Sequence, residues 1–237
     1  MLNRDSGPRR PDSVTGVIMA TASTQIVNPL RASGTELDRT GQIVAAAYDL
    51  LAEEGLEGLT IRAVLARTGL ARRAFYDRFV GKDDLVLAVF DQTLRASADY
   101  FRTMTEAMDD PLEAIRVILT DVVLGGISAD VAVSDADQRR TVALSREHLR
   151  LAESRPADLQ AAISPLLDLI AELLGKGTEQ GRIRPCDPAL TAALMFNLAA
   201  NTVHTEMLAQ AALAGDQGRR KHLAEEIWEF CRRAIVA

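Results

Sequence analysis

The chain has 237 residues, of which 48% are hydrophobic and 25% charged, and its formal net charge is −6. This composition excludes an intrinsically disordered chain, because the apolar residues suffice for a sizeable core. The acidity argues against a nucleic-acid binder, since the charge of the whole chain governs its non-specific attraction to phosphate. Cys186 and Cys231 have no C-x-x-C spacing, so we expect no disulfide framework, no metal site and a reducing, cytoplasmic location.

The first 34 residues combine glycine, proline, serine and threonine without a periodic apolar stripe, which predicts a flexible tail. Arg9 and Arg10 are not followed by a sustained apolar segment, so no secretory signal is expected. The nearest candidate for a membrane span, residues 189–205, contains Asn197 and Asn201 and is about a turn too short for a bilayer. We therefore expect a buried helix there and no contact with a membrane.

Helical periodicity begins at Thr35, where Thr35-x-x-Asp38 is typical of a helix start, and apolar residues then recur at helical spacing up to Gly55. Three short helical segments are expected next, closing near position 81. An acidic pair, Asp83 and Asp84, then opens a long helix, because acidic residues are favoured in the first turn.

The rest of the chain also shows helical patterns. Further helices are predicted over residues 111–124, 138–151, 157–182, 187–212 and 216–236, with a loop over residues 130–137. No run of alternating β-branched and polar residues occurs. The predicted fold class is therefore all-α, with about nine helices.

Residues 59–79 are the most informative segment and predict two helices joined by a tight turn. Thr60 is placed to cap the first helix, and Gly69 to end it in the left-handed conformation. The second helix begins at Ala71 and buries Phe75 and Phe79, which leaves its basic residues facing outward. A bracing helix followed by a helix for the DNA major groove is the helix-turn-helix arrangement. The alternative is an ordinary helical hairpin with a solvated basic face.

Charge along the chain supports the DNA-binding interpretation. Residues 60–82 contain six basic side chains and one acidic side chain, a local charge of +5, which leaves −11 for the rest of the chain. Such asymmetry allows one face to neutralise phosphates while the remaining surface discourages non-specific contact with DNA. The acidity thus restricts where DNA binds rather than excluding it.

The segment from about Thr40 to Leu85 resembles the N-terminal domain of the tetracycline-repressor (TetR) family of bacterial transcriptional regulators. The resemblance rests on an ordered set of positions: the approach from Gly55 to Thr60, Arg62, Gly69-Leu70, Phe75-Tyr76, Phe79 and Lys82-Asp83-Asp84-Leu85. It implies a helix-turn-helix domain at residues 35–84 and a helical effector-binding and dimerisation domain at residues 85–237. It also implies a homodimer on a palindromic operator in double-stranded DNA, most often a repressor, that a small molecule releases.

The second helix of the motif departs from the family pattern. Ala71 and Ala74 stand in place of the usual Ser and Thr, and Leu65 stands in place of a small residue. We therefore expect contacts with DNA to depend on arginine, with Arg72 and Arg73 as the substitutes. The predicted DNA-binding residues are Thr60, Arg62, Ala71, Arg72, Arg73, Ala74, Tyr76, Arg78 and Lys82.

A candidate effector pocket lies in the second domain, where two interpretations stay open. Met and Phe shape adaptable apolar pockets, but they serve equally well as core. Asn197 and Asn201 share a helix face with His204 and fit either a pocket or the packing of a dimer interface. The candidate pocket residues are Phe101, Met104, Met108, Leu119, Val123, Leu166, Met195, Phe196, Asn197 and Asn201, and the expected ligand is largely apolar.

The dimer interface is expected on the last two helices. The helix from residue 187 has almost no polar face, so both of its sides need cover. In the resembled family these two helices form a four-helix bundle with the partner, and Gly177-x-x-x-Gly181-x-Ile183 looks like the family's turn before its penultimate helix. The candidate interface residues are His204, Leu223, Ile227, Phe230 and Ala234.

An enzymatic function has little support, and neither a cofactor nor a metal is expected. His148, His204 and His222 lack the spacing of metal ligands, and no G-x-S-x-G motif occurs. His148 stands among charged residues and is expected at the surface. Two alternatives remain open. One is a ligand-independent DNA-binding protein, either architectural or controlled by a partner, and the other is an all-α enzyme or scaffold that does not bind DNA.

Overall fold

The computed structural model describes residues 38–124, 135–210 and 217–237. Within these ranges the chain forms nine α-helices and no strand, although Ile183 and Val236 pair in an isolated antiparallel bridge. The predicted all-α class is confirmed. None of the described helices is long and apolar enough to cross a bilayer. The tail predicted at residues 1–34 lies outside the described residues.

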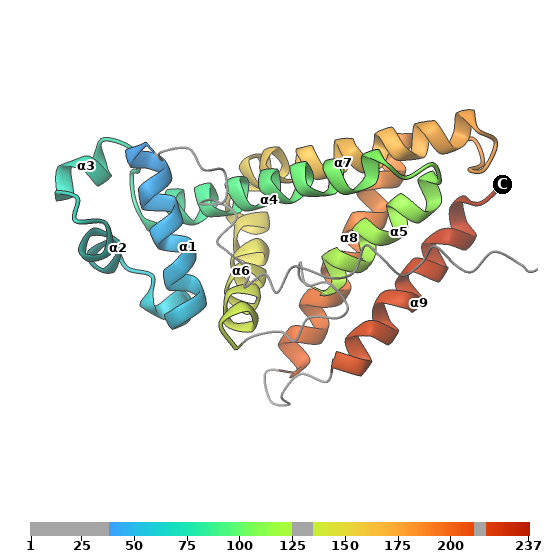
Figure 1. The fold of residues 1–237 in the computed structure, drawn as a ribbon. Helices are drawn as coiled ribbons and strands as arrows, with labels where there is room; N and C mark the ends of the chain where they lie inside the picture. Colours follow the sequence, from blue (N-terminus) through green and yellow to red (C-terminus); the bar gives the residue numbers. More distant parts are fainter. Residues whose placement is uncertain (1–37, 125–134, 211–216) are drawn as a thin grey trace, which may run out of the picture.

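The first three helices form a head at one end of the molecule (Figure 1). They are α1 (Arg39–Gly58), α2 (Ile61–Thr68) and α3 (Arg72–Tyr76). Helix α1 supplies most of the core of the head, because Ile43, Ala47 and Leu51 recur on one face and are buried. Asp38 caps α1, its carboxylate accepting a hydrogen bond from the Gly41 N–H at 2.7 Å.

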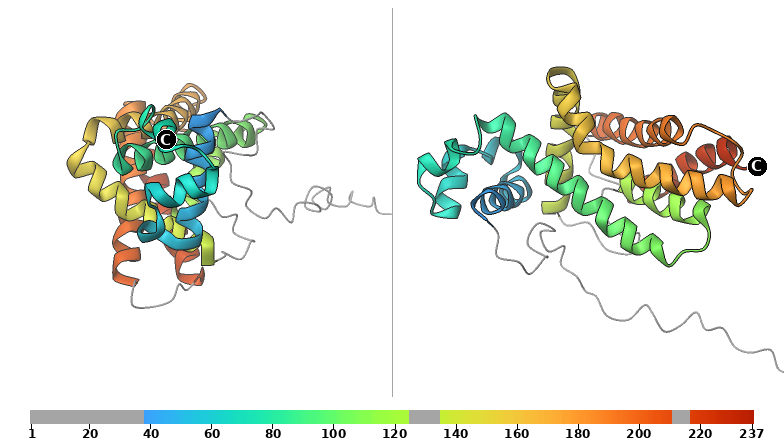
Figure 2. Two further views of the ribbon diagram at one scale, coloured as in Figure 1. Left: turned by 90° about the vertical axis from the view of Figure 1, so that its left-hand side faces the viewer. Right: turned by 90° about the horizontal axis from the view of Figure 1, so that it is seen from above.

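Helix α4 (Lys82–Glu106) leads out of the head and runs along the body beside α7 (Pro156–Glu179) (Figures 1 and 2). Helices α5 (Pro111–Leu124), α8 (Pro188–Gln210) and α9 (Gln217–Ile235) complete the body away from the head. Helix α6 (Asp135–Ser154) stands between the two parts and packs against both α1 and α7. It is therefore placed to link the head with the body.

The helix boundaries follow the predicted ones within a few residues, with three differences. The predicted helix start at Thr35 lies outside the described residues, and Asp38 is the observed cap. Two short helices, not three, separate α1 from α4, because α1 continues for about a turn past a kink at Gly55. Helix α6 begins at Asp135, inside the loop predicted over residues 130–137, whose earlier residues lie outside the described part of the chain.

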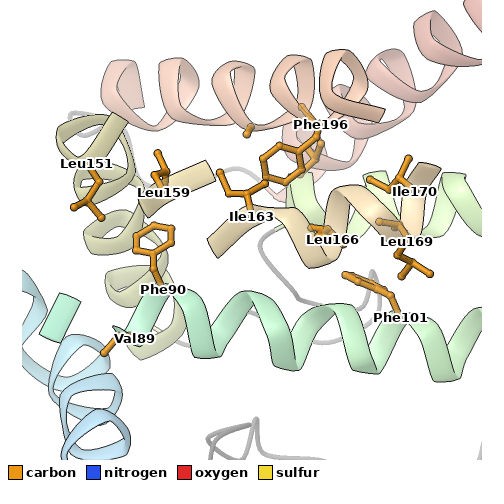
Figure 3. Close-up of a cluster of buried hydrophobic side chains, with 14 of the residues drawn as sticks. Val89, Phe90, Phe101, Leu151, Leu159, Ile163, Leu166, Leu169, Ile170 and Phe196 are labelled. Carbon is orange, nitrogen blue, oxygen red and sulfur yellow. The ribbon is translucent and has the colours of Figure 1, made fainter. Parts of the chain in front are cut away.

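The core of the body lies between α4, α7 and α8 (Figure 3). Phe90 and Phe101 of α4, Ile163 and Leu166 of α7, and Phe196 of α8 are all buried in one cluster. Burial of each such side chain contributes about 1.5–3 kcal/mol. Because these contacts extend along α4, the helix that leaves the head is fixed to α7 along the body.

A tight turn between α7 and α8 closes the far end of the body. Gly177 packs so closely that a Cβ there would lie 2.4 Å from the Ile183 Cδ1, and Gly181 takes the left-handed conformation with φ +69°. The Arg184 N–H donates to the Ile235 carbonyl at 2.9 Å, which joins this turn to the end of α9. This geometry explains why glycine stands at both positions of Gly177-x-x-x-Gly181-x-Ile183.

Candidate nucleic-acid interface

Two capping interactions build the helix-turn-helix. The Thr60 Oγ1 accepts a hydrogen bond from the Ala63 N–H at 3.1 Å and so caps α2. Gly69 ends α2 with φ +68°, in the left-handed region, and its N–H donates to the Leu65 carbonyl at 3.0 Å. The predicted roles of Thr60 at the start of α2 and of Gly69 at its end are both confirmed. The turn that follows sets the angle at which α3 leaves α2.

Two buried phenylalanines anchor α3. Phe75 is fully buried, Phe79 is nearly so, and their ring centroids lie 5.4 Å apart. With these rings fixed in the core of the head, Arg72, Arg73 and Tyr76 lie on the exposed face of α3. The sequence-based prediction of which face is buried is therefore correct.

Exposed arginines dominate the surface of α2 and α3. Arg62 on α2 and Arg72, Arg73 and Arg78 on or just after α3 are all exposed. The Arg72 guanidinium lies 5.5 Å from the centroid of the Tyr76 ring, which orients it by a cation–π contact. Arg78 donates one bond to the Ala74 carbonyl at 3.0 Å and keeps its other N–H groups. Planar guanidinium groups in this arrangement suit phosphate and guanine edges.

Two further basic residues of the segment are engaged within the protein. The Arg67 guanidinium makes paired hydrogen bonds with both oxygens of Glu53 on α1, which lowers the pKa of that carboxyl. The Lys82 Nζ, half-buried, donates to the Leu56 carbonyl at 2.9 Å. The outward positive charge is thus carried mainly by four arginines. Sequence reasoning missed the Glu53–Arg67 pair, because the two residues lie on different helices and share no local spacing.

The remaining predicted contact residues surround this face. Thr60 and Ala71 are exposed and Ala74 is half-buried. Ala71 occupies the N-cap position of α3 without a side-chain hydrogen bond, as expected from the absence of Ser there. The structure therefore gathers all nine predicted residues around α2, α3 and the start of α4, with Lys82 the most enclosed of the charged ones.

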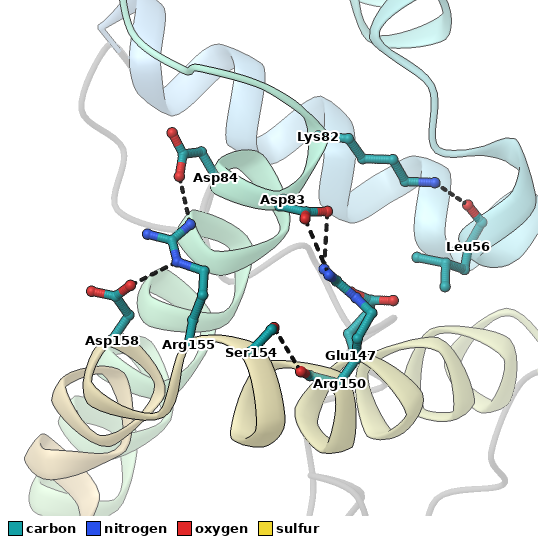
Figure 4. A network of polar contacts seen from close by, with 9 residues as sticks. All are labelled: Leu56, Lys82, Asp83, Asp84, Glu147, Arg150, Ser154, Arg155 and Asp158. Carbon is teal, nitrogen blue, oxygen red and sulfur yellow. Dashed lines mark hydrogen bonds and ion pairs between the residues drawn. The ribbon is translucent and has the colours of Figure 1, made fainter.

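A network of ion pairs joins the start of α4 to α6 and α7 (Figure 4). Arg150 on α6 donates to both oxygens of Asp83, at 3.1 and 3.0 Å, and to the buried Glu147 at 2.8 Å. Arg155, just before α7, pairs with Asp84 and so lowers the pKa of that carboxyl. These contacts join the helix that leaves the head to both α6 and the start of α7.

Helix α6 also contacts the head directly. The Arg139 Nε donates to the Ala52 carbonyl of α1 at 3.0 Å, and the Arg140 guanidinium lies 4.3 Å from the centroid of the Tyr48 ring. One helix therefore contacts α1 at one end and the start of α4 at the other. These contacts could not be predicted from local spacing, because all the partners are distant in the chain.

The candidate effector residues do not all face one region. Phe101, Leu119, Val123, Leu166, Met195 and Phe196 are buried, and Met104 and Met108 are half-buried. Asn197 and Asn201 are exposed on the opposite side of α8. These two amides therefore do not join the buried residues within the protomer.

The candidate interface residues also divide into two groups. Phe230, 67% exposed, and Ala234 lie on the outer face of α9. Leu223 is half-buried, whereas His204 and Ile227 are buried within the single chain. Exposed Leu190 and Leu194, at 58% and 62%, lie on α8 and were not singled out from the sequence. Their exposure could not be predicted, because the sequence of a helix without a polar face does not indicate which side is exposed.

The capped α2, the glycine turn and the arginine-bearing α3 define a helix-turn-helix DNA-binding protein. In the described part of the chain, no group of three or more His, Cys, Asp or Glu side chains is placed to hold a metal ion.

Comparison with known families agrees with this class. Residues 43–89 match the model for bacterial regulatory proteins of the tetR family, and residues 136–233 match the AefR-like transcriptional repressor C-terminal domain. The chain belongs to the TetR family of transcriptional regulators. Its function is accordingly DNA-binding regulation of transcription and not enzymatic catalysis.

Individual relatives are distant in sequence but similar in fold. The HTH-type transcriptional repressor KstR2 of Mycobacterium tuberculosis is 24% identical over 160 residues, covering 65% of this chain and 74% of that protein. The fatty acid degradation regulator FadR of Bacillus halodurans superposes with a TM-score of 0.64 at 18% identity, over 84% of this chain and 96% of that one. RolR, whose structure was solved with the ligand resorcinol, superposes with a TM-score of 0.59 at 18% identity, over 83% of this chain and 87% of that one.

Proposed function

We propose that this regulator is a homodimeric repressor that binds a palindromic operator through two copies of its head and is released by a small-molecule effector. The observation that carries the proposal is the exposed set Arg62, Arg72, Arg73 and Arg78 on the helix-turn-helix, in a chain that is otherwise strongly acidic. Repression is supported by the description of the relative KstR2 as a repressor. The DNA-binding domain is assigned to residues 35–84 and the effector-binding and dimerisation domain to residues 85–237.

The proposed dimer forms through the outer faces of α8 and α9. Leu190 and Leu194 on α8 and Phe230 and Ala234 on α9 are exposed, and exposed apolar side chains on paired helices are typical of an interface. Asn197 and Asn201, on the same exposed side of α8, fit this interface better than a pocket. A twofold axis at this surface places two heads on successive major-groove turns of a palindromic site.

The proposed effector binds inside the body and is largely apolar, in keeping with the side chains between α4, α7 and α8. The resorcinol complex of RolR, a protein of the same fold, supports a small molecule as the effector class. Release requires that the effector bind one spacing of the heads more tightly than the other. Helix α4 is the proposed route, because it joins the head to the body core. We place the protein and its operator in the cytoplasm.

The test begins with selection of duplexes from a random DNA library, since the operator is not yet defined. The full chain is expected to enrich an inverted repeat, and its affinity is expected to fall steeply with salt. The double variant Arg72→Ala/Arg73→Ala is expected to lose the enrichment. Arg95→Ala is the matched control, because Arg95 lies on α4 and pairs with Asp91 within the body. Enrichment that is unchanged in the double variant contradicts the proposed contacts.

A further inference from the structure

Two histidines meet inside the body, between α6 and α8. The ring centroids of His148 and His204 lie 4.7 Å apart with an angle of 38° between the planes, and the Phe90 ring lies 6.1 Å from His148. The expectation that His148 lies at the surface was wrong: it is half-buried, because α6 turns this side toward α8 and α4. Glu147, next to it, is buried as well.

His204 is the unusual member of the pair. Its side chain is only 8% exposed, and neither Nδ1 nor Nε2 has a hydrogen-bond partner among the described residues. Buried polar groups in folded proteins are almost always hydrogen-bonded, so an orphaned buried ring needs an explanation. The two rings are tilted against each other, and no hydrogen bond joins them.

A second unpartnered polar atom lies on the neighbouring helix α4. The Thr93 Oγ1 is buried and has no hydrogen-bond partner in the described part of the chain. Thr93 is one turn from Phe90 and shares its helix face. On α8, Phe196, Ala200 and His204 form one buried stripe, in which the small Ala200 separates the aromatic ring from the imidazole. Thr93 on α4 and His204 on α8 thus each have buried polar atoms without a partner in the described part of the chain.

Burial favours the uncharged form of both imidazole rings. Burial lowers the pKa of both histidines, and for His204 burial and the neighbouring His148 bring the pKa to about 4. A neutral imidazole offers one N–H donor and one acceptor nitrogen. Such a pair suits a partner that is itself uncharged and forms hydrogen bonds.

We propose that His148 and His204 bind the hydroxyl or carbonyl group of a small molecule whose apolar body lies against Phe90 and Phe196. This inference deepens the proposed function, on which it rests, by naming the polar group that the effector carries. A metal ion is a weaker candidate, because the described residues contribute no third ligand. The combination of apolar walls with a few convergent polar groups is typical of small-molecule sites.

The position of the pair connects it to the head. His148 directly follows Glu147, whose carboxylate holds Arg150, and Arg150 in turn holds Asp83 at the start of α4. A ligand that displaces His148 moves this part of α6 and with it the ion pairs that fix α4. Occupancy of the site and the angle of the head are thus coupled through adjacent residues.

The test measures binding of three matched probes by calorimetry: 4-ethylphenol, 4-methylacetophenone and the hydrocarbon 4-ethyltoluene. The wild-type chain is expected to bind the phenol and the ketone about tenfold more tightly than the hydrocarbon, the factor expected for a hydrogen bond to a buried group. His204→Leu and His148→Leu, each tested separately, are expected to abolish this preference. His222→Leu is the control, because His222 is exposed on α9. Thermal unfolding confirms that each variant is folded.

The outcomes separate clearly. Equal binding of the three probes to the wild-type chain, no binding of any, or a preference that survives in both variants overturns the proposal. Thermal stabilisation by zinc chloride that His204→Leu abolishes identifies a metal site instead and also overturns it. The pair of variants keeps the test decisive if one of them unfolds. Salt-dependent binding of DNA by the ligand-free chain is measured in parallel, and its absence counts against the proposed function while leaving the probe result intact.

Discussion

Arg150 holds Asp83 and Glu147 at the same time. Its guanidinium bonds both oxygens of the exposed Asp83 at the start of α4 and the carboxylate of Glu147, which is only 5% exposed. The two carboxylates differ in their access to water, so loss of the shared arginine has unequal consequences for them. One side chain therefore joins an exposed carboxylate on α4 to a buried carboxylate on α6.

Removal of the Arg150 side chain is expected to destabilise the folded chain more than removal of the charge on its exposed partner Asp83. Arg150→Ala leaves Glu147 buried without its cation, and an unsatisfied buried group costs about 1–3 kcal/mol. Asp83→Asn removes only an exposed pair, worth about 0.2–1 kcal/mol. Urea unfolding of both variants measures the difference. Equal destabilisation by the two substitutions shows that Glu147 does not depend on Arg150.

The conformation of Gly69 makes it sensitive to substitution. Gly69→Ala places a Cβ at φ +68°, and the variant is expected to lose about 1–2 kcal/mol. Gly81→Ala is the matched control, because Gly81 has extended backbone and no atom within 4 Å of a new Cβ. Chemical unfolding of the two variants checks the prediction. A cost at position 81 as large as that at position 69 contradicts the backbone explanation.

Helix α3 lacks a side-chain cap, and this can be repaired. Ala71 sits at the N-cap with extended backbone, so Ala71→Ser is expected to stabilise the chain by about 0.5–1 kcal/mol. Thr60→Ala, which removes the observed cap of α2, is expected to destabilise it by a similar amount. Opposite shifts of the thermal midpoint confirm the capping assignment, and shifts of the same sign refute it.

The two kinds of arginine in the head are expected to differ in their effect on DNA binding. Arg72→Ala removes an outward charge and is expected to reduce the slope of log affinity against log salt by about 1. Arg67→Ala removes a charge that Glu53 already balances and is expected to change this slope little. Fluorescence anisotropy with the selected operator over a range of salt concentrations measures both. Equal slopes for the two variants indicate that the Glu53–Arg67 pair opens when DNA binds.

The histidine pair predicts how stability depends on acid. The pKa of His204 is about 4 in the folded chain and about 6.5 in an unfolded one. Between these values the unfolded chain binds a proton that the folded chain does not, so stability falls as the pH drops from about 6.5 to 4. The stability of the His204→Leu variant is expected to fall less steeply than that of the wild-type chain over this range. Urea unfolding at a series of pH values measures it, with His222→Leu as the control, and parallel curves for His204→Leu and wild type contradict the shift.

Local sequence patterns predicted the head well. Two kinds of feature depend on neighbours within a turn or two, and residue spacing therefore predicts them. They are the caps at Thr60 and Gly69 and the buried helix face with Phe75 and Phe79. Contacts between distant helices were not predicted. The Glu53–Arg67 pair and the Arg150–Asp83 pair join residues on different helices, and nothing in their spacing indicates that they meet.

Burial in the second domain was harder to predict. His148 was expected outside because its neighbours are charged, but Glu147 and Arg150 satisfy each other and permit burial. Helix α8 is apolar on almost every side, so its composition did not distinguish the inward Phe196 from the outward Leu194. Only the packing of three helices decides which side faces the core.

The two ends of the body differ in how they resist deformation. At the far end, backbone hydrogen bonds join the turn after α7 to the end of α9. Gly177 and Ile183 are packed there without space for a larger side chain at position 177. At the near end, guanidinium–carboxylate contacts between partly exposed side chains join α4 to α6 and α7. We therefore expect the far end of the body to be rigid and the near end, beside the head, to be more easily deformed. We expect strain introduced into the body to be released at this near end, where a small change of angle would displace the arginines on α3.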